Sequence, residues 1–305
     1  MTSDAKISVG QAPRDPARLR RPRVGERLWL FMRKFGENSS ALAGAAIVCL
    51  LVGLSVGAPL LTDYEPLALG SPPLLSPQPS HPMGTDDLGR DLFSQFLYGG
   101  RASAFVGVVA AAISTSIGVM LGALSGYWGG RIDNVIQRIT EMFSIIPRYF
   151  LAMVTVAILG NSILNVTLVI GLLSWPSTTK LARAEFATLK TRSFVDAAKM
   201  SGASSTSIIF REILPNALPA IVVQTILTIS AAILLEATLS FLGLGDPAVV
   251  SWGLMLNRAQ AFLTQAPWMA IFPGLGISLF ILGLNLMGDG LNQALNPRLR
   301  REAKE

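Results

Sequence analysis

The residues that could carry out chemistry in this chain are few and widely spaced. The sequence contains one cysteine, Cys49, and one histidine, His81. A disulfide framework, a cysteine metal site and catalysis by paired histidines are therefore excluded. His81 lies near Asp86 and Asp87, but a single imidazole among carboxylates is a poor transition-metal site. We expect a structural role for His81 and no metal bound by this chain.

Nucleotide hydrolysis has no support in the sequence either. A phosphate-binding loop requires the pattern Gly-x4-Gly-Lys-Ser/Thr, and no Gly-Lys dipeptide occurs among the 305 residues. The chain is therefore predicted not to be an enzyme and to bind no cofactor of its own.

Two ionisable residues are notable because their surroundings are apolar. Arg148 and Glu236 fall within long hydrophobic stretches, where a charge is costly and is functional by default. They are candidates to line a translocation pathway, with Arg148 facing a solute carboxylate and Glu236 a solute amino group. The alternative is structural, with Arg148 paired to Glu141 or Glu236 or reaching the membrane surface.

The elements that must position these residues are membrane helices. Hydrophobic residues make up 51% of the chain and charged residues only 14%, whereas soluble domains are about 25% charged. The mean hydropathy is +0.50. Each of six stretches is long enough to cross a hydrocarbon core of about 30 Å. The sequence thus predicts an all-α, polytopic membrane protein with six transmembrane helices, at 41–61, 103–127, 135–159, 163–181, 218–241 and 269–291.

Small residues at helical spacing predict where these helices pack closely. Gly118, Gly122 and Gly126 form one such series, and Gly53 and Gly57 form a shorter one. Small residues four apart allow two helix backbones to approach each other, so ordinary helix packing is the expected role.

The positive charges predict the orientation. The net charge is +6, and most lysines and arginines lie in segments 1–40, 128–138, 180–215 and 296–305. By the positive-inside rule these segments, and both termini, are cytoplasmic. Nucleic-acid binding is not expected, because no basic face carries interleaved aromatics. The expected organisation is a basic arm with an interfacial helix (1–40), a first span (41–61), an extracytoplasmic loop (62–100), a core domain (101–295) and a cytoplasmic tail (296–305).

The most informative polar stretch lies between the fourth and fifth predicted spans. Asp196 opens a short helix with two small residues, Ala197 and Ala198, and Gly202 then permits a tight turn. A second short helix leads into the next span. Two short helices on one cytoplasmic loop indicate a docking surface for a partner.

This loop, at about 186–215, resembles the EAA loop of ABC importer permeases. In that family Glu-Ala-Ala is followed, after three intervening residues, by glycine, and the loop ends in a hydrophobic residue, any residue, leucine and proline. Here the matching residues are Asp196, Ala197, Ala198, Gly202, Leu214 and Pro215, and Ile213 lies one position after the family's isoleucine and is counted with them as a docking candidate. The sequence departs from the pattern twice, with Asp196 in place of the usual glutamate and Glu212 at the usual isoleucine position.

Other stretches narrow the resemblance to the dipeptide, oligopeptide and nickel permeases, and to their C-type subunit. The similar segments are in order along about residues 27–300: His-Pro-Met-Gly-Thr-Asp-Asp-Leu-Gly-Arg-Asp at 81–91, Phe-Leu-Gly-Leu-Gly at 241–245 with Ser-Trp-Gly at 251–253, Phe-Pro-Gly at 272–274, Asn-Leu-Met-Gly-Asp-Gly-Leu at 285–291 and Asn-Pro-Arg-Leu-Arg at 296–300.

The resemblance implies a type I ABC importer transmembrane-domain fold in a bacterial inner membrane. It implies four kinds of partner: the lipid membrane, a second permease subunit, two cytoplasmic ABC ATPase subunits that use ATP and Mg, and an extracytoplasmic solute-binding protein. The residues matched in the EAA loop would dock the ATPase, and the transported solutes would be peptides or related small molecules. The alternative is a self-sufficient secondary transporter, with Glu236 as the main candidate for an ion-coupling acid.

Overall fold

The computed structural model describes residue 36 and residues 38–295. Most of the expected basic arm, including its interfacial helix, and the expected tail at 296–305 lie outside the described residues. Within the described part the chain is helical and has no β-strand, apart from isolated bridges in the loop before α4.

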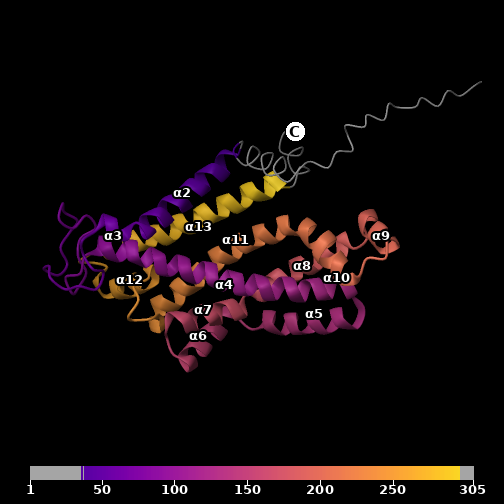
Figure 1. Ribbon diagram of the computed structural model, residues 1–305. Coiled ribbons are helices and arrows are strands. Elements are labelled where there is room, and N and C mark those ends of the chain that lie inside the picture. The colour runs from indigo at the N-terminus through magenta and orange to yellow at the C-terminus, as the bar shows by residue number, and fades with distance from the viewer. Residues whose placement is uncertain (1–35, 37, 296–305) are drawn as a thin grey trace, which may run out of the picture.

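The helices pack side by side in an elongated bundle (Figure 1). The loop at 62–91, here called the cap, lies with α3 and α12 at one end, and α9 and α10 lie at the other. In chain order the elements are α2 (Ser39–Val56), α3 (Ala58–Leu61), α4 (Leu92–Trp128), α5 (Gly130–Ile145), α6 (Arg148–Leu159), α7 (Ile163–Leu173), α8 (Trp175–Leu189), α9 (Ser193–Met200), α10 (Ser205–Ser207), the π-helix η2 (Ile208–Ile213), α11 (Leu214–Leu239), the π-helix η3 (Ser240–Leu244), α12 (Trp252–Ala259), the short η4 (Gln260–Phe262) and α13 (Trp268–Leu295).

Four helical segments of the described chain are long and apolar enough to cross a membrane. They are Ser39–Val56, Leu92–Trp128, Ser205–Leu244 and Trp268–Ala294. A fifth span results if α5 and α6, which meet at an angle of 83°, are counted as one. The chain is thus a multi-pass helical protein.

The two remaining predicted spans differ from straight helices for a local reason. The stretch at 135–159 breaks at Ile146, which is extended because the following Pro147 disfavours the helical conformation. The stretch at 163–181 divides at Ser174 into α7 and α8, and Pro176 occupies the first turn of α8. A proline there cannot donate a hydrogen bond to the preceding turn, so it begins a helix more readily than it continues one.

Helix α4 begins eleven residues before the predicted span and shortens the predicted loop. The Asp91 carboxylate accepts a hydrogen bond of 2.7 Å from the Ser94 amide and so caps the first turn. Ser94 and Gln95, which are polar but buried, lie inside the helix. Helix α4 therefore includes residues 92–100 of the predicted loop. The predicted first span is also divided, because α2 ends at Val56 and Pro59 lies in the first turn of α3.

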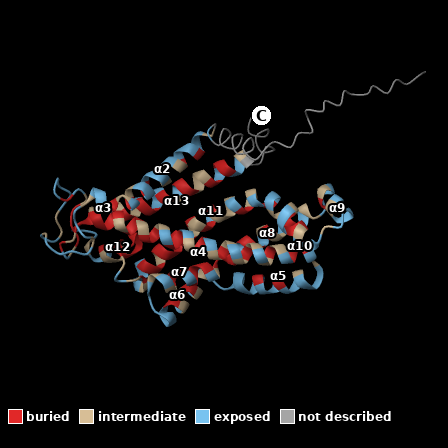
Figure 2. Ribbon diagram, in the orientation of Figure 1, coloured by how far each residue is buried: buried red, intermediate tan, exposed pale blue. Residues whose placement is uncertain are grey.

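Buried residues line the inner faces of the bundle, and exposed residues cover its outer faces (Figure 2). Large apolar side chains remain exposed on the outside, among them Leu50, Ile158 and Leu164. An apolar exterior on helices of this length is typical of surfaces that face lipid.

The glycine series in α4 lies at a close helix contact, as predicted. A Cβ at Gly122 would lie 2.5 Å from the Ala182 Cβ, and one at Gly118 would lie 2.6 Å from Thr178. Helices α4 and α8 are therefore packed backbone to backbone. Gly53 has no atom of the described chain within 4 Å of its Cβ position, so its predicted packing role is not fulfilled within this chain.

Candidate functional site

Helix α9 rests on the end of the bundle by one face. Val195 is fully buried in an apolar cluster with Phe186 of α8 and Ile209 of η2. Phe194 and Ala198 are partly buried against the same cluster, whereas Asp196, Ala197, Lys199 and Met200 are exposed. The helix is thus anchored by one apolar edge centred on Val195 and presents its polar residues and Met200 to solvent. Val195 was not among the residues predicted to form the docking surface. Val195 precedes the half-buried Ala198 by three residues, which places both on one face of the helix.

Gly202 ends α9 with a hydrogen-bonded turn that requires a left-handed residue. Its φ is +78°, its amide donates to the Lys199 carbonyl at 3.0 Å, and the Ala203 amide donates to the Ala198 carbonyl at 3.1 Å. These two bonds form a Schellman motif, which favours glycine at this position. The predicted tight turn is therefore present.

Asp196 lies in the first turn of α9, where an acidic side chain interacts favourably with the helix dipole. It accepts a hydrogen bond of 3.2 Å from Lys199, and the two side chains are 60% and 44% exposed. An ion pair this exposed contributes little to stability. Its carboxylate therefore remains accessible at the surface.

The predicted docking residues after Gly202 do not all reach the surface. Ile213 is fully buried in the same cluster as Val195, Leu214 is half-buried and Pro215 is exposed. The structure brings Ile213 together with the anchor of α9, so its contacts are made within this chain. Pro215 occupies the first turn of α11.

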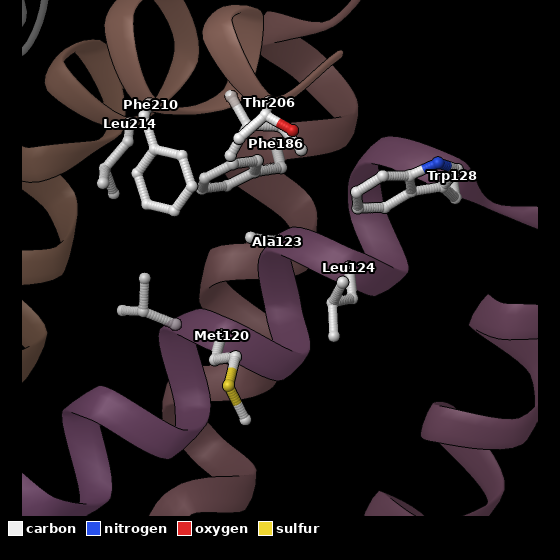
Figure 3. A pocket seen from close by; sticks show the side chains of 10 residues that line it. Met120, Ala123, Leu124, Trp128, Phe186, Thr206, Phe210 and Leu214 are labelled. Atoms are coloured by element: carbon white, nitrogen blue, oxygen red, sulfur yellow. The ribbon is translucent and has the colours of Figure 1, made fainter.

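An apolar pocket of about 320 Å³ lies between α4 and the segment that follows Gly202 (Figure 3). In the close-up, Phe210, Leu214 and Phe186 lie across from the α4 side chains. The segment after Gly202 is therefore less closely packed on α4 than α8 is. The lining residues are Val119, Met120, Ala123, Leu124, Trp128, Phe186, Thr206, Ile209, Phe210 and Leu214.

At the other end of the bundle, His81 holds the cap together. Its Nδ1 lies 2.8 Å from the Asp91 Oδ1, and its Nε2 lies 2.9 Å from the Ser71 Oγ. The ring is buried, and both its nitrogens are engaged within the protein. Because Asp91 also caps α4, His81 connects the loop to that helix, which is the structural role expected from the sequence.

A second buried carboxylate in the cap connects it to α12. Asp86 accepts hydrogen bonds from the Arg90 amide at 2.8 Å and from the Gln95 side chain at 2.9 Å. Gln95 in turn accepts one of 3.3 Å from Arg258 in α12. Burial lowers the pKa of Arg258, and the nearby Arg90 charge lowers it further, while Asp86 acts in the opposite direction. The motif at 81–91 thus acts as a brace between α4 and α12.

Replacing His81 is expected to loosen the cap. In His81→Ala, Asp91 and Ser71 each lose a buried partner, which should cost about 2–3 kcal/mol of local stability. Limited proteolysis of the purified protein should then cleave within 62–91 at least tenfold faster. Ser80→Ala, at an exposed position of the same loop, should leave the cleavage rate unchanged. Equal rates in both variants would rule out the bracing role.

Glu236, the second pathway candidate, is enclosed between helices. It is 3% exposed and accepts hydrogen bonds from Ser240 at 2.7 Å and from Ser103 of α4 at 3.3 Å. It also lines a small cavity with Asp246 and Ser251. Its hydrogen bonds to serine hydroxyls connect α11 to α4.

Arg148 begins α6, directly after the bend that follows α5. Its guanidinium carbon lies 5.9 Å from the centre of the Tyr149 ring. The structural alternative, an ion pair of Arg148 with Glu141 or Glu236, does not form. The Glu141 Oε2 instead lies 3.7 Å from the Arg138 Nη1, and Glu236 accepts its hydrogen bonds from serines. The two pathway candidates are therefore not brought together.

A polar cluster that the sequence analysis missed lies at the α9 end of the bundle. Arg183 of α8 donates through Nε and Nη2 to the two carboxylate oxygens of Asp133 in α5. Ser125 of α4 donates to the same carboxylate. We call the Asp133–Arg183 pair the fork. No local pattern could have indicated it, since its two residues are fifty positions apart.

These features define a class: a multi-pass membrane protein with a braced cap at one end and an exposed, anchored short helix at the other. The chain belongs to the family of binding-protein-dependent transport system inner membrane components, whose family model matches residues 118–301. The resemblance to peptide permeases predicted from the sequence is confirmed by its relatives.

Three of these relatives cover nearly the whole chain. The dipeptide transport system permease protein DppC of Haemophilus influenzae is 38% identical over 90% of this chain and 95% of its own length. The di/tripeptide permease of Pseudomonas aeruginosa is 37% identical over 90% and 93%. The oligopeptide permease OppC of Bacillus subtilis is 35% identical over 88% and 89%.

The fold is also found in a solved transporter. An inward-facing form of the MetNI methionine ABC transporter matches with a TM-score of 0.53 at 21% identity, over 65% of this chain and 94% of that one. At this identity the likeness concerns the fold alone.

Proposed function

We propose that this chain is one of two permease subunits of an ATP-driven importer for peptides or related small solutes in a bacterial inner membrane. The second permease subunit completes the pathway, and a solute-binding protein delivers the solute from outside. Two cytoplasmic ATPase subunits bind ATP and Mg and hydrolyse the nucleotide. The names of the relatives support the choice of peptides as solutes.

The observation that carries this proposal is the exposed face of α9. A helix anchored by Val195, with Phe194 and Ala198 beside it, and ended by Gly202 offers Asp196, Ala197 and Met200 to a partner. In the proposed complex this face and the exposed Pro215 contact an ATPase subunit. Ile213 acts indirectly, because it packs under the helix.

The proposed topology has six spans and places both termini in the cytoplasm. Helices α5 and α6 form one broken span and α7 and α8 another, which adds two crossings to the four unbroken ones. An even number of crossings leaves both ends of the chain on one side. The excess of lysine and arginine around α9 makes that side cytoplasmic.

The environment of Glu236 argues against a self-sufficient secondary transporter. Such a protein needs an acid that exchanges ions with solvent during each cycle. Glu236, the main candidate, is 3% exposed and bonded to Ser240 and Ser103. As a pathway residue in the proposed importer, it would meet the solute only after α4 and α11 separate.

Cysteine crosslinking tests the docking of the ATPase. In a Cys49→Ser background, a Met200→Cys variant carries its thiol on α9 at a position 85% exposed. Leu60→Cys is a matched control, 91% exposed at the opposite end of the bundle. Each variant is coexpressed with the second permease and the ATPase, and membranes are treated with a short thiol-to-amine crosslinker.

We expect Met200→Cys to form a crosslinked product with the ATPase subunit and Leu60→Cys to form none. A product with Leu60→Cys, or none with Met200→Cys in an assembled complex, would contradict the proposed docking and orientation.

A further inference from the structure

Helix α5 has few apolar contacts with the rest of the protein. Only Ile136 and Thr140 are buried along its sixteen residues. Apart from a contact between the rings of Phe143 and Trp175 of α8, whose centres are 5.3 Å apart, its position depends on polar contacts. The fork between Asp133 and Arg183 joins its first turn to α8. Both nitrogen–oxygen distances of the fork are 2.5 Å.

The fork is geometrically specific. A guanidinium that meets a carboxylate through two parallel hydrogen bonds fixes orientation as well as distance. The Asp133 side chain is 17% exposed and that of Arg183 is 39% exposed, so solvent screens the pair only in part. By contrast, Arg138 and Glu141 on the same helix meet at 3.7 Å with side chains 80% and 58% exposed.

On the other side of the fork, α8 and α9 share one apolar cluster. The close glycine contacts join α8 to α4, and Val195 of α9 packs in one cluster with Phe186, which lies one turn after Arg183 in α8. This cluster gives a displacement of α9 a path to α8, because packed side chains transmit strain. Beyond α5 the chain bends by 83° and continues into α6 at Arg148.

We propose that the fork of Asp133 and Arg183 transmits the movement of α9 to the bent span α5–α6, so that both residues are positioning residues for coupled transport. This inference rests on the proposed function, in which the ATPase moves α9. Without the fork, α8 would move with α9 while α5 stayed behind, and ATP would be hydrolysed without solute import.

The experiment measures the number of solute molecules imported per ATP hydrolysed by the assembled importer in proteoliposomes. Asp133→Asn and Arg183→Gln each remove one half of the fork. The double variant leaves two neutral amide side chains facing each other and no unpaired charge. As a control, Glu141→Gln removes the exposed ion pair between Arg138 and Glu141 on the same helix.

In each single variant we expect the import-to-hydrolysis ratio to fall about fivefold or more, within the range found for residues in coupling networks. The double variant should fall no further than either single variant, because the two residues act as one unit. The ratio for Glu141→Gln should stay at the wild-type value.

An unchanged ratio, additive losses, or an equal loss in Glu141→Gln would overturn the inference. If a single variant does not assemble, the double variant decides by the same ratio, and its failure to assemble would show that the fork is only a structural brace. Wild-type importer that hydrolyses ATP but imports no peptide would instead overturn the proposed function, and the inference with it.

Discussion

Gly202→Val is expected to reduce ATP-driven uptake at least about tenfold. Gly202 has a φ of +78°, a conformation that a β-branched residue adopts only with strain, at a cost of about 1–2 kcal/mol. Relieving that strain breaks the two hydrogen bonds that end α9. The last turn of α9, with Lys199 and Met200, then loses its place on the docking face. Uptake and copurification of the ATPase with the permease measure the loss.

The matched control for this effect is Gly202→Asn. No atom lies within 4 Å of the Cβ position, so a side chain meets no obstacle, and asparagine tolerates the left-handed conformation best after glycine. This variant should keep at least half of wild-type uptake. Equal losses in both variants would show that the turn conformation does not determine coupling.

Gly122→Leu is expected to prevent stable packing of α4 on α8. A Cβ at this position would lie 2.5 Å from the Ala182 Cβ and 2.8 Å from the Thr179 carbonyl oxygen. Backbone atoms cannot rotate away, so the helices must separate and lose contacts along the glycine series. Overpacking of this kind costs about 3 kcal/mol or more. The purified variant should show a clearly lower melting temperature and little assembled complex on size-exclusion chromatography.

Gly53→Leu is the control for added bulk on a membrane helix. Gly53 has open space at its Cβ position, so its variant should melt within a few degrees of wild type. A melting temperature of Gly122→Leu equal to that of Gly53→Leu would contradict the close contact between α4 and α8.

Features with a local physical signal could be predicted from the sequence. Long apolar stretches indicated the helices, because lipid-exposed backbone must satisfy its hydrogen bonds internally. Gly202 indicated the turn, since few other residues adopt its conformation without cost. Gly118, Gly122 and Gly126 indicated a close helix contact, although not that α8 is the partner.

Features that depend on tertiary contacts could not be predicted in this way. Ser94 and Gln95 begin α4 although they are polar, because the cap provides their hydrogen-bond partners. Ile213 looked like a docking residue but is buried beneath α9. The fork between Asp133 and Arg183 forms only once α5 folds back along α8.

Import of a radiolabelled dipeptide into proteoliposomes is the most direct test of the proposed ATP-driven, binding-protein-dependent import. The liposomes contain this chain, the second permease and the ATPase, with ATP inside and the loaded binding protein outside. We expect uptake that requires both ATP and the binding protein and that persists when ionophores collapse the proton and sodium gradients. Uptake by this chain alone, driven by an ion gradient without ATP, would contradict it.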